Sequence, residues 1–71
     1  MIRIYLSRLL GERRWTQADL ARKTKIRAAT INEYYNEFAE RVKLEHLDKI
    51  CEALGCELEE LIQRVPDAKT K

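Results

Sequence analysis

The sequence is poor in the residues that build metal sites, catalytic centres and disulfide frameworks. Only two cysteines and one histidine occur in 71 residues. Cys51 and Cys56 stand five positions apart with His46 as the single histidine, so the close Cys/His pairs of a zinc site are missing. A catalytic Cys–His pair would also lack a third group to orient it. We therefore expect no enzyme activity, no metal and no cofactor, with both cysteines reduced in the core and His46 exposed.

Long apolar runs are also absent. No stretch approaches the roughly 20 apolar residues that cross a bilayer, and the first residues lack the layout of a signal peptide. We therefore expect a cytoplasmic protein with no membrane partner. Its composition, 45% apolar and 37% charged, predicts one globular domain whose small core makes stability depend on helix packing or self-association. Such a chain leaves little room for an enzyme pocket, and no small-molecule ligand is evident.

The charges are unevenly divided along the chain, although the net charge is only +2. Residues 1–27 hold eight Lys/Arg against two Asp/Glu, a net +6, and the remainder holds six against ten, a net −4. A phosphate-facing front and a solvated back would produce this division, and so would chance.

The middle of the chain carries the strongest local pattern, which begins with a helix start. Thr16 is a predicted N-cap with Asp19 as its capping-box partner, so a helix should begin at Gln17. Trp15 and Leu20 occupy the two positions of a hydrophobic staple, which would fix how the preceding chain enters this helix.

A tight turn and a second short helix follow. The residues from 24 to 26 interrupt the pattern, and Ile31 and Tyr34 then form an apolar pair three positions apart on a helix over about 28–35. The opposite face carries small and polar residues, namely Arg27, Ala28, Ala29, Asn32 and Glu33. Small residues would let this helix sit deep in a DNA major groove. There the arginine could bind guanine, the asparagine an adenine edge, the glutamate a cytosine amino group and the alanine methyls a thymine methyl. A solvated helix face would have the same composition.

With these residues the chain resembles the Cro/repressor-type (Xre-like) helix-turn-helix family of transcription regulators. The similarity covers residues 6–65 and rests on three groups of residues: 16–21; Ile26, Thr30, Ile31, Tyr34 and Asn36; and 47–56 with Leu58 and Leu61. It implies an all-α, compact five-helix domain of the lambda-repressor-like type with its helix-turn-helix at about 17–35. An extended arm over residues 1–5 and a frayed tail over 67–71 would flank it.

The resemblance also implies a function, which is sequence-specific binding of double-stranded DNA by a homodimer that represses transcription. The family's base-reading positions match Ala28, Ala29 and Glu33, and Arg27 and Asn32 flank them. Candidate phosphate contacts are Thr16, Gln17, Arg22, Lys25, Asn36, Arg41 and Lys43, with Arg13, Arg14 and Lys23 as further basic candidates. A protein of this kind would be cytoplasmic and associated with the nucleoid.

Three residues depart from the family pattern. Lys25 stands where glycine is usual, in a turn that needs a left-handed backbone, at a cost of about 1 kcal/mol. Arg27 replaces a Ser- or Thr-type cap. Glu37 follows Asn36 where glycine is frequent, which would place a carboxylate near a phosphate.

The flanking segments predict the rest of the fold. Residues 1–6 alternate with period two, as a short strand does, and in a helical chain such a strand would be an arm or would pair with a second molecule. Two further helices are expected, one from about Leu44 to Gly55 and one that ends before Pro66. Dimerisation through residues 1–6 and through the last helix remain alternatives.

The apolar positions predict which side chains are buried. The expected core comprises Leu6, Leu9 and Leu10; Phe38 and Val42 of the connector; Leu44, Leu47, Ile50, Cys51 and Leu54; and Leu58, Leu61, Ile62 and Val65. The three tyrosines lie on different elements and are interpreted as packing residues rather than as a stacking surface for single strands.

Two other functions compete with the repressor. One is the antitoxin of a two-gene module, which neutralises a partner protein and represses its own operon. The other is a protein-interaction module that has lost DNA binding, which Lys25, Glu33 and Glu37 would favour.

Overall fold

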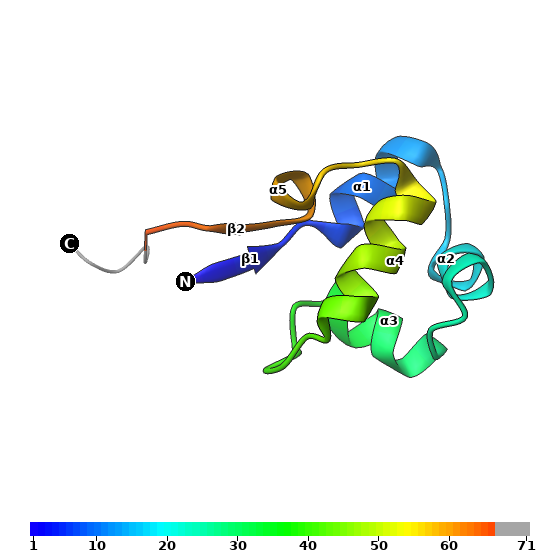
Figure 1. Cartoon of the computed structure of the whole chain (residues 1–71), viewed down its shortest axis with the longest axis horizontal. Helices are drawn as coiled ribbons and strands as arrows, with labels where there is room; N and C mark the ends of the chain where they lie inside the picture. Colours follow the sequence, from blue (N-terminus) through cyan, green and yellow to red (C-terminus); the bar gives the residue numbers. More distant parts are fainter. Residues whose placement is uncertain (67–71) are drawn as a thin grey trace.

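Five helices surround one core, and two short strands project from it (Figure 1). The computed structural model describes residues 1–66, so the predicted frayed tail at 67–71 lies outside the described residues. In chain order the elements are β1 (Ile2–Ile4), α1 (Leu6–Arg13), α2 (Gln17–Thr24), α3 (Ala28–Tyr35), α4 (Leu44–Leu54), α5 (Leu58–Leu61) and β2 (Ile62–Arg64). The predicted five-helix fold is confirmed, with a small sheet in addition.

The core is built from every helix. Its fully buried side chains are Leu6 and Leu10 of α1, Leu20 of α2, Ile31 of α3, Ile50 of α4 and Leu61 of α5. Burying a side chain of this size stabilises a fold by roughly 1.5–3 kcal/mol relative to leaving it exposed. The angle between α2 and α3 therefore depends on packing against the other three helices as well as on the turn that joins them.

The predicted start of α2 is confirmed in detail. The Thr16 hydroxyl accepts a hydrogen bond from the Asp19 amide at 3.0 Å, and the Asp19 carboxylate accepts one from the Thr16 amide at 2.9 Å. Trp15 is half-buried and packs against the core, and the Lys23 ammonium lies 5.4 Å from the centre of its indole ring. A helix of eight residues is marginal alone, and these contacts at its first turn help to hold it.

The N-terminal strand has a partner within the chain, contrary to the sequence-based expectation. β1 pairs antiparallel with β2, Ile2 opposite Arg64 and Ile4 opposite Ile62. The Tyr5 amide extends this ladder by donating to the Leu61 carbonyl at 2.7 Å. Pairing satisfies backbone groups that would otherwise be left to solvent.

The same pairing corrects the predicted last helix, which ends at Leu61 and not near Pro66. The four-residue spacing of its apolar positions fits a helix, but a segment this short gains few helical hydrogen bonds. From Ile62 the backbone is extended, with φ −130° and ψ 146°, and it bonds to β1 instead. Tertiary pairing has overridden the local helical pattern.

Three apolar residues that were predicted to be buried are exposed. Phe38 is 75% exposed, Leu44 81% and Leu58 47%. Leu44 and Leu58 are the first residues of α4 and α5. Both belong to the predicted helices, but at these helix starts no other element that the structure describes covers their side chains. Val42 is half-buried against the core as predicted. The exposed side chains give the surface apolar character that the sequence did not predict.

His46 is not exposed as predicted but half-buried between α3 and α4. The Tyr34 hydroxyl lies 2.7 Å from its Nδ1 atom, and the two rings meet edge to face with their centres 5.8 Å apart. The partner is twelve positions away, so no local pattern could reveal it.

Both cysteines are free thiols, Cys56 buried and Cys51 half-buried. Burial and the neighbouring Cys56 thiol raise the pKa of Cys51 to about 11. The thiol of Cys51 therefore stays protonated at neutral pH, as expected for a packing residue and not for a nucleophile.

Candidate nucleic-acid interface

The turn between α2 and α3 has the left-handed residue that the sequence predicted. Lys25 has φ +63°, and its amide donates to the Ala21 carbonyl at 2.8 Å. Beside it, the buried Thr24 hydroxyl donates to the Leu20 carbonyl at 2.7 Å and accepts from the Ile26 amide at 3.3 Å. These bonds fix the turn tightly, which offsets the cost of a left-handed lysine.

α3 has one buried face and one exposed face. Ile31 and Tyr34 are 0% and 3% exposed, and they anchor the helix to the core. The five predicted base-reading residues all lie in the open: Arg27, Ala28, Ala29, Asn32 and Glu33. Arg27 is the residue before the helix and makes no capping hydrogen bond with its side chain. The structure thus brings these side chains together on one accessible surface.

Asn32 and Asn36 form a pair at the end of this surface. The Asn36 amide nitrogen donates to both the main-chain carbonyl and the side-chain oxygen of Asn32, each at 3.0 Å. The bond orients the Asn32 amide group, whose nitrogen keeps two donors for a ligand. Asn36, predicted as a phosphate contact, therefore also acts as a positioning residue for Asn32.

The start of α2 presents polar groups beside α3. Thr16 is exposed and Gln17 half-buried. Because the Thr16 hydroxyl accepts its bond from Asp19, its own proton remains for a further acceptor. Arg22 forms an ion pair with Asp19, and hydrogen bonding to Thr16 and then Arg22 lowers the pKa of that carboxyl. Arg22 is thus partly neutralised by its own helix.

Arg13, one of the further basic candidates for a phosphate contact, also has a structural role. Its guanidinium donates to the Leu54 carbonyl at 2.8 Å and to the Leu9 carbonyl at 3.2 Å. It therefore satisfies a carbonyl at the C-terminal end of α4, where a positive charge is favoured. The other basic candidates, Arg14, Lys23, Lys25, Arg41 and Lys43, are exposed.

The Glu37 carboxylate, which the sequence placed near a possible phosphate, is bound by β1. It accepts from the Arg3 Nε and Nη2 atoms at 2.8 and 2.9 Å and from the Ile4 amide at 3.0 Å. These hydrogen bonds lower the pKa of Glu37 to about 2. Glu37 itself has φ +59°, where glycine is favoured. Sequence reasoning missed Arg3 because it lies 34 positions away.

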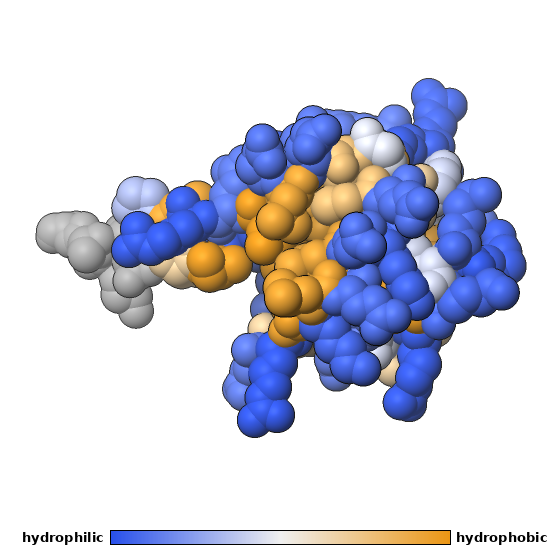
Figure 2. All heavy atoms as spheres, in the orientation of Figure 1, coloured by the Kyte–Doolittle hydropathy of each residue, from blue (hydrophilic) through white to orange (hydrophobic). Residues whose placement is uncertain are grey.

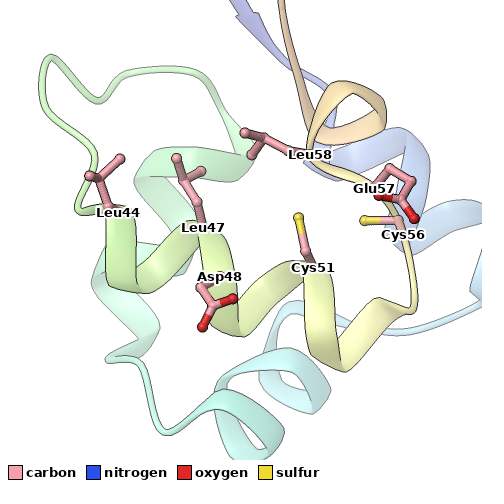
Figure 3. Close-up of a pocket in the computed structure, with 7 residues that line it drawn as sticks. All are labelled: Leu44, Leu47, Asp48, Cys51, Cys56, Glu57 and Leu58. Carbon is pink, nitrogen blue, oxygen red and sulfur yellow. The ribbon is translucent and has the colours of Figure 1, made fainter.

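One hollow borders α3, and another lies on the side of the molecule formed by α4 and α5. One, of about 360 Å³, is open and is lined by Glu33 of α3 and by Phe38, Ala39, Glu40 and Arg41 of the connector to α4. The other, of about 280 Å³, lies between α4 and α5 and is lined by Leu44, Leu47, Asp48, Cys51, Cys56, Glu57 and Leu58 (Figure 3). Figure 2 shows hydrophobic residues gathered on this face of α4 and α5, with hydrophilic residues around them.

Residues 1–66 contain no group of three or more His, Cys, Asp or Glu side chains placed to hold a metal ion. None of the helices described in this range has the length and apolar character needed to span a membrane.

Comparison with known proteins gave one family and one informative structure. A family model described as the Cro/C1-type HTH DNA-binding domain matches residues 5–67. A crystal structure of a candidate DNA-binding protein from Bacteroides fragilis matches with a TM-score of 0.79 at 24% sequence identity, over 89% of this chain and 100% of that chain. At this identity the likeness shows the fold alone. No curated protein matches the chain.

Proposed function

Because this chain belongs to the Cro/C1-type helix-turn-helix DNA-binding family, we propose that it is a sequence-specific regulator that represses transcription as a homodimer. In this proposal α3 enters the major groove of double-stranded DNA and α2 lies over the sugar-phosphate backbone. Such a protein would act in the cytoplasm, at the nucleoid.

The exposed face of α3 is the observation that carries the proposal. Ala28 and Ala29 leave the first turn without bulky side chains, so the helix backbone can come close to base edges. Arg27, Asn32 and Glu33 surround them with groups that pair with guanine, adenine and cytosine respectively. Ile31 and Tyr34 fix the helix from behind.

Phosphate contacts would frame that face. Thr16 and Gln17 stand at the start of α2, where main-chain amides also favour an anion. Arg22 and Lys25, with Asn36 beyond α3 and Arg41 and Lys43 in the connector, complete the proposed set. Each phosphate that a cationic side chain neutralises should add about −0.9 to the slope of log K, the logarithm of the DNA-binding constant, against the logarithm of the salt concentration.

One monomer would make few base contacts, which favours a dimer because a dimer reads two half-sites. The face around Leu44, Leu47, Cys51 and Leu58 supports this, because Leu44 protrudes beside the apolar hollow between α4 and α5 (Figure 3). In a symmetric dimer each Leu44 would occupy the hollow of the other copy, since such an interface uses the same surface twice. None of these residues belongs to the proposed DNA-reading face.

The test is selection of bound duplexes from a random-sequence pool at near-physiological salt. We expect a palindrome whose half-sites lie about 10 base pairs apart. A single half-site would retain DNA binding and reject the dimer. An absence of enrichment would reject the proposal and leave the protein-interaction module. If Gln17→Ala and Arg27→Ala both bind the enriched duplex as the wild type does, the interface is misplaced.

The same apolar face is the observation that favours a second candidate, the antitoxin. An antitoxin needs a surface for its partner in addition to one for DNA. Co-expression with the product of an adjacent gene tests this, and a stable complex that Leu58→Glu abolishes would favour it over the simple repressor.

A further inference from the structure

Phe38, the only phenylalanine in the chain, is 75% exposed. Single exposed apolar residues are common on protein surfaces and need no explanation by themselves. The position of Phe38 and the way its backbone is held are what distinguish it.

The backbone that carries Phe38 is tied down on two sides. The Phe38 amide donates to the Glu33 carbonyl at 2.9 Å, and the Glu37 amide donates to the Tyr34 carbonyl at 3.2 Å. The Glu37 carboxylate is bound by Arg3 and by the Ile4 amide of β1. The exposure of the ring is therefore set by the fold, and presenting it to a ligand costs little additional ordering.

Phe38 also lies next to the reading face of α3. Glu33, Phe38 and Arg41 line the same open hollow, and Figure 1 shows the connector projecting from the body at the end of α3. A duplex that contacts Glu33 would therefore lie beside the hollow that Phe38 and Arg41 also line. An apolar ring at this place can pack against the apolar part of a nucleotide.

Acidic groups in this region decide which kind of contact fits. Glu40 lines the same hollow, and its carboxylate would repel a phosphate. A contact between Phe38 and DNA would therefore not depend on the charged residues around the ring. The charge of Glu37 is already paired with Arg3. An apolar contact from the ring is thus the interaction that this part of the connector offers most directly.

We propose that Phe38 is a DNA-contacting residue whose ring packs against the apolar part of a nucleotide, a deoxyribose or a thymine methyl group, beside the bases that α3 reads. This inference rests on the proposed function, because it requires a bound duplex. It adds a contact that is independent of salt to an interface whose other proposed contacts, apart from the alanine methyls, are ionic or polar.

The first test measures how tightly variants bind the duplex enriched by selection. Fluorescence anisotropy gives the affinity of each variant at a series of salt concentrations. Phe38→Ser should weaken binding about tenfold with an unchanged salt slope, because no counterion is involved. Phe38→Leu should retain most of the affinity. Arg41→Ala should instead flatten the slope by about 0.9. Ile2→Ser, at a position 60% exposed on β1, is the matched control and should bind as the wild type does.

The second test identifies the nucleotide group. Each thymine of the enriched duplex is replaced in turn by uracil, which removes only a methyl group. If one replacement weakens binding by the wild type and has no effect on Phe38→Ser, the ring contacts that methyl group. If Phe38→Ser binds more weakly but every uracil replacement affects it and the wild type equally, the ring contacts a deoxyribose.

The inference and the proposed function fail in different ways. Wild-type affinity in Phe38→Ser together with a loss in Gln17→Ala would overturn the inference and leave DNA binding intact. Sedimentation showing that Phe38→Ser only dissociates a dimer would also overturn it, since the ring would then contact protein. No enriched duplex, or wild-type binding by all three of Phe38→Ser, Gln17→Ala and Arg27→Ala, would overturn both.

Discussion

Arg3 and Glu37, 34 positions apart, are joined by two hydrogen bonds of 2.8 and 2.9 Å between their charged groups. The contact links the N-terminal strand to the residue two positions after α3. It therefore ties the connector at the end of the proposed recognition helix to the β1–β2 sheet, on which none of the proposed DNA contacts lies.

The first prediction concerns the acid stability that this pair confers. The folded pKa of Glu37, about 2, lies below its ordinary value of 4.5, so its contribution is present above pH 4.5 and is lost as the pH falls toward 2. Glu37→Gln should be destabilised by about 0.5–1 kcal/mol at pH 7, because the pair is largely exposed, and should converge on the wild type near pH 2. Urea unfolding at both pH values measures this, and an equal difference at the two would contradict it.

The second prediction concerns the left-handed lysine. Lys25→Gly should stabilise the fold by about 0.5–1 kcal/mol, because glycine adopts φ +63° without the penalty of a side chain. Lys23→Gly, inside α2, removes the same charge and should destabilise by about 1 kcal/mol. Thermal unfolding of the two variants decides the matter, and a loss of stability in Lys25→Gly would show that its side chain has a structural role.

The third prediction uses the only histidine. Burial and then the nearby Lys43 lower the pKa of His46 from its usual 6.5. The folded state thus binds its proton less readily than the unfolded chain, so stability is complete above pH 6.5 and falls as the pH drops through the lowered value. Unfolding between pH 7.5 and 5.5 should show this decline in the wild type and not in His46→Gln. A decline that persists in the variant would assign it to other groups.

The fourth prediction concerns self-association. Leu44→Lys should fold normally, because Leu44 is 81% exposed, but sedimentation should show a monomer with weakened binding to a palindromic duplex and unchanged binding to a half-site. Ile2→Lys is the matched change on β1. Should Ile2→Lys dissociate the protein instead, the dimer forms through the N-terminal strand.

Short sequence patterns predicted much of this fold correctly. The capping box at Thr16, the left-handed Lys25 and the end of α4 at Gly55 each depend on a few adjacent residues, and each was recognised. The two faces of α3 follow from helical spacing alone, so the accessibility of its five candidate residues was also predicted correctly.

The errors share a physical origin in distant partners. Residues 62–64 form a strand because β1 is beside them, and the Glu37 carboxylate is paired with Arg3 of β1. The hydrogen bond from Arg13 to the Leu54 carbonyl, at 2.8 Å, also joins residues that are far apart in the sequence. The sequence likewise shows that Phe38 and Leu44 are apolar, but it does not show whether another element covers their side chains. None of these contacts can be recognised from the residues within one or two helical turns of the side chain concerned.

The sheet has a practical consequence for building larger proteins from this domain. The N-terminal amine of Met1 donates to the Val65 carbonyl at 2.8 Å, so the two ends of the fold leave it side by side (Figure 1). A short linker between them would close the chain into a ring, and new termini could then be opened elsewhere on the surface. For the same reason the whole domain could be grafted into a single loop of a host protein, with α3 still facing outward.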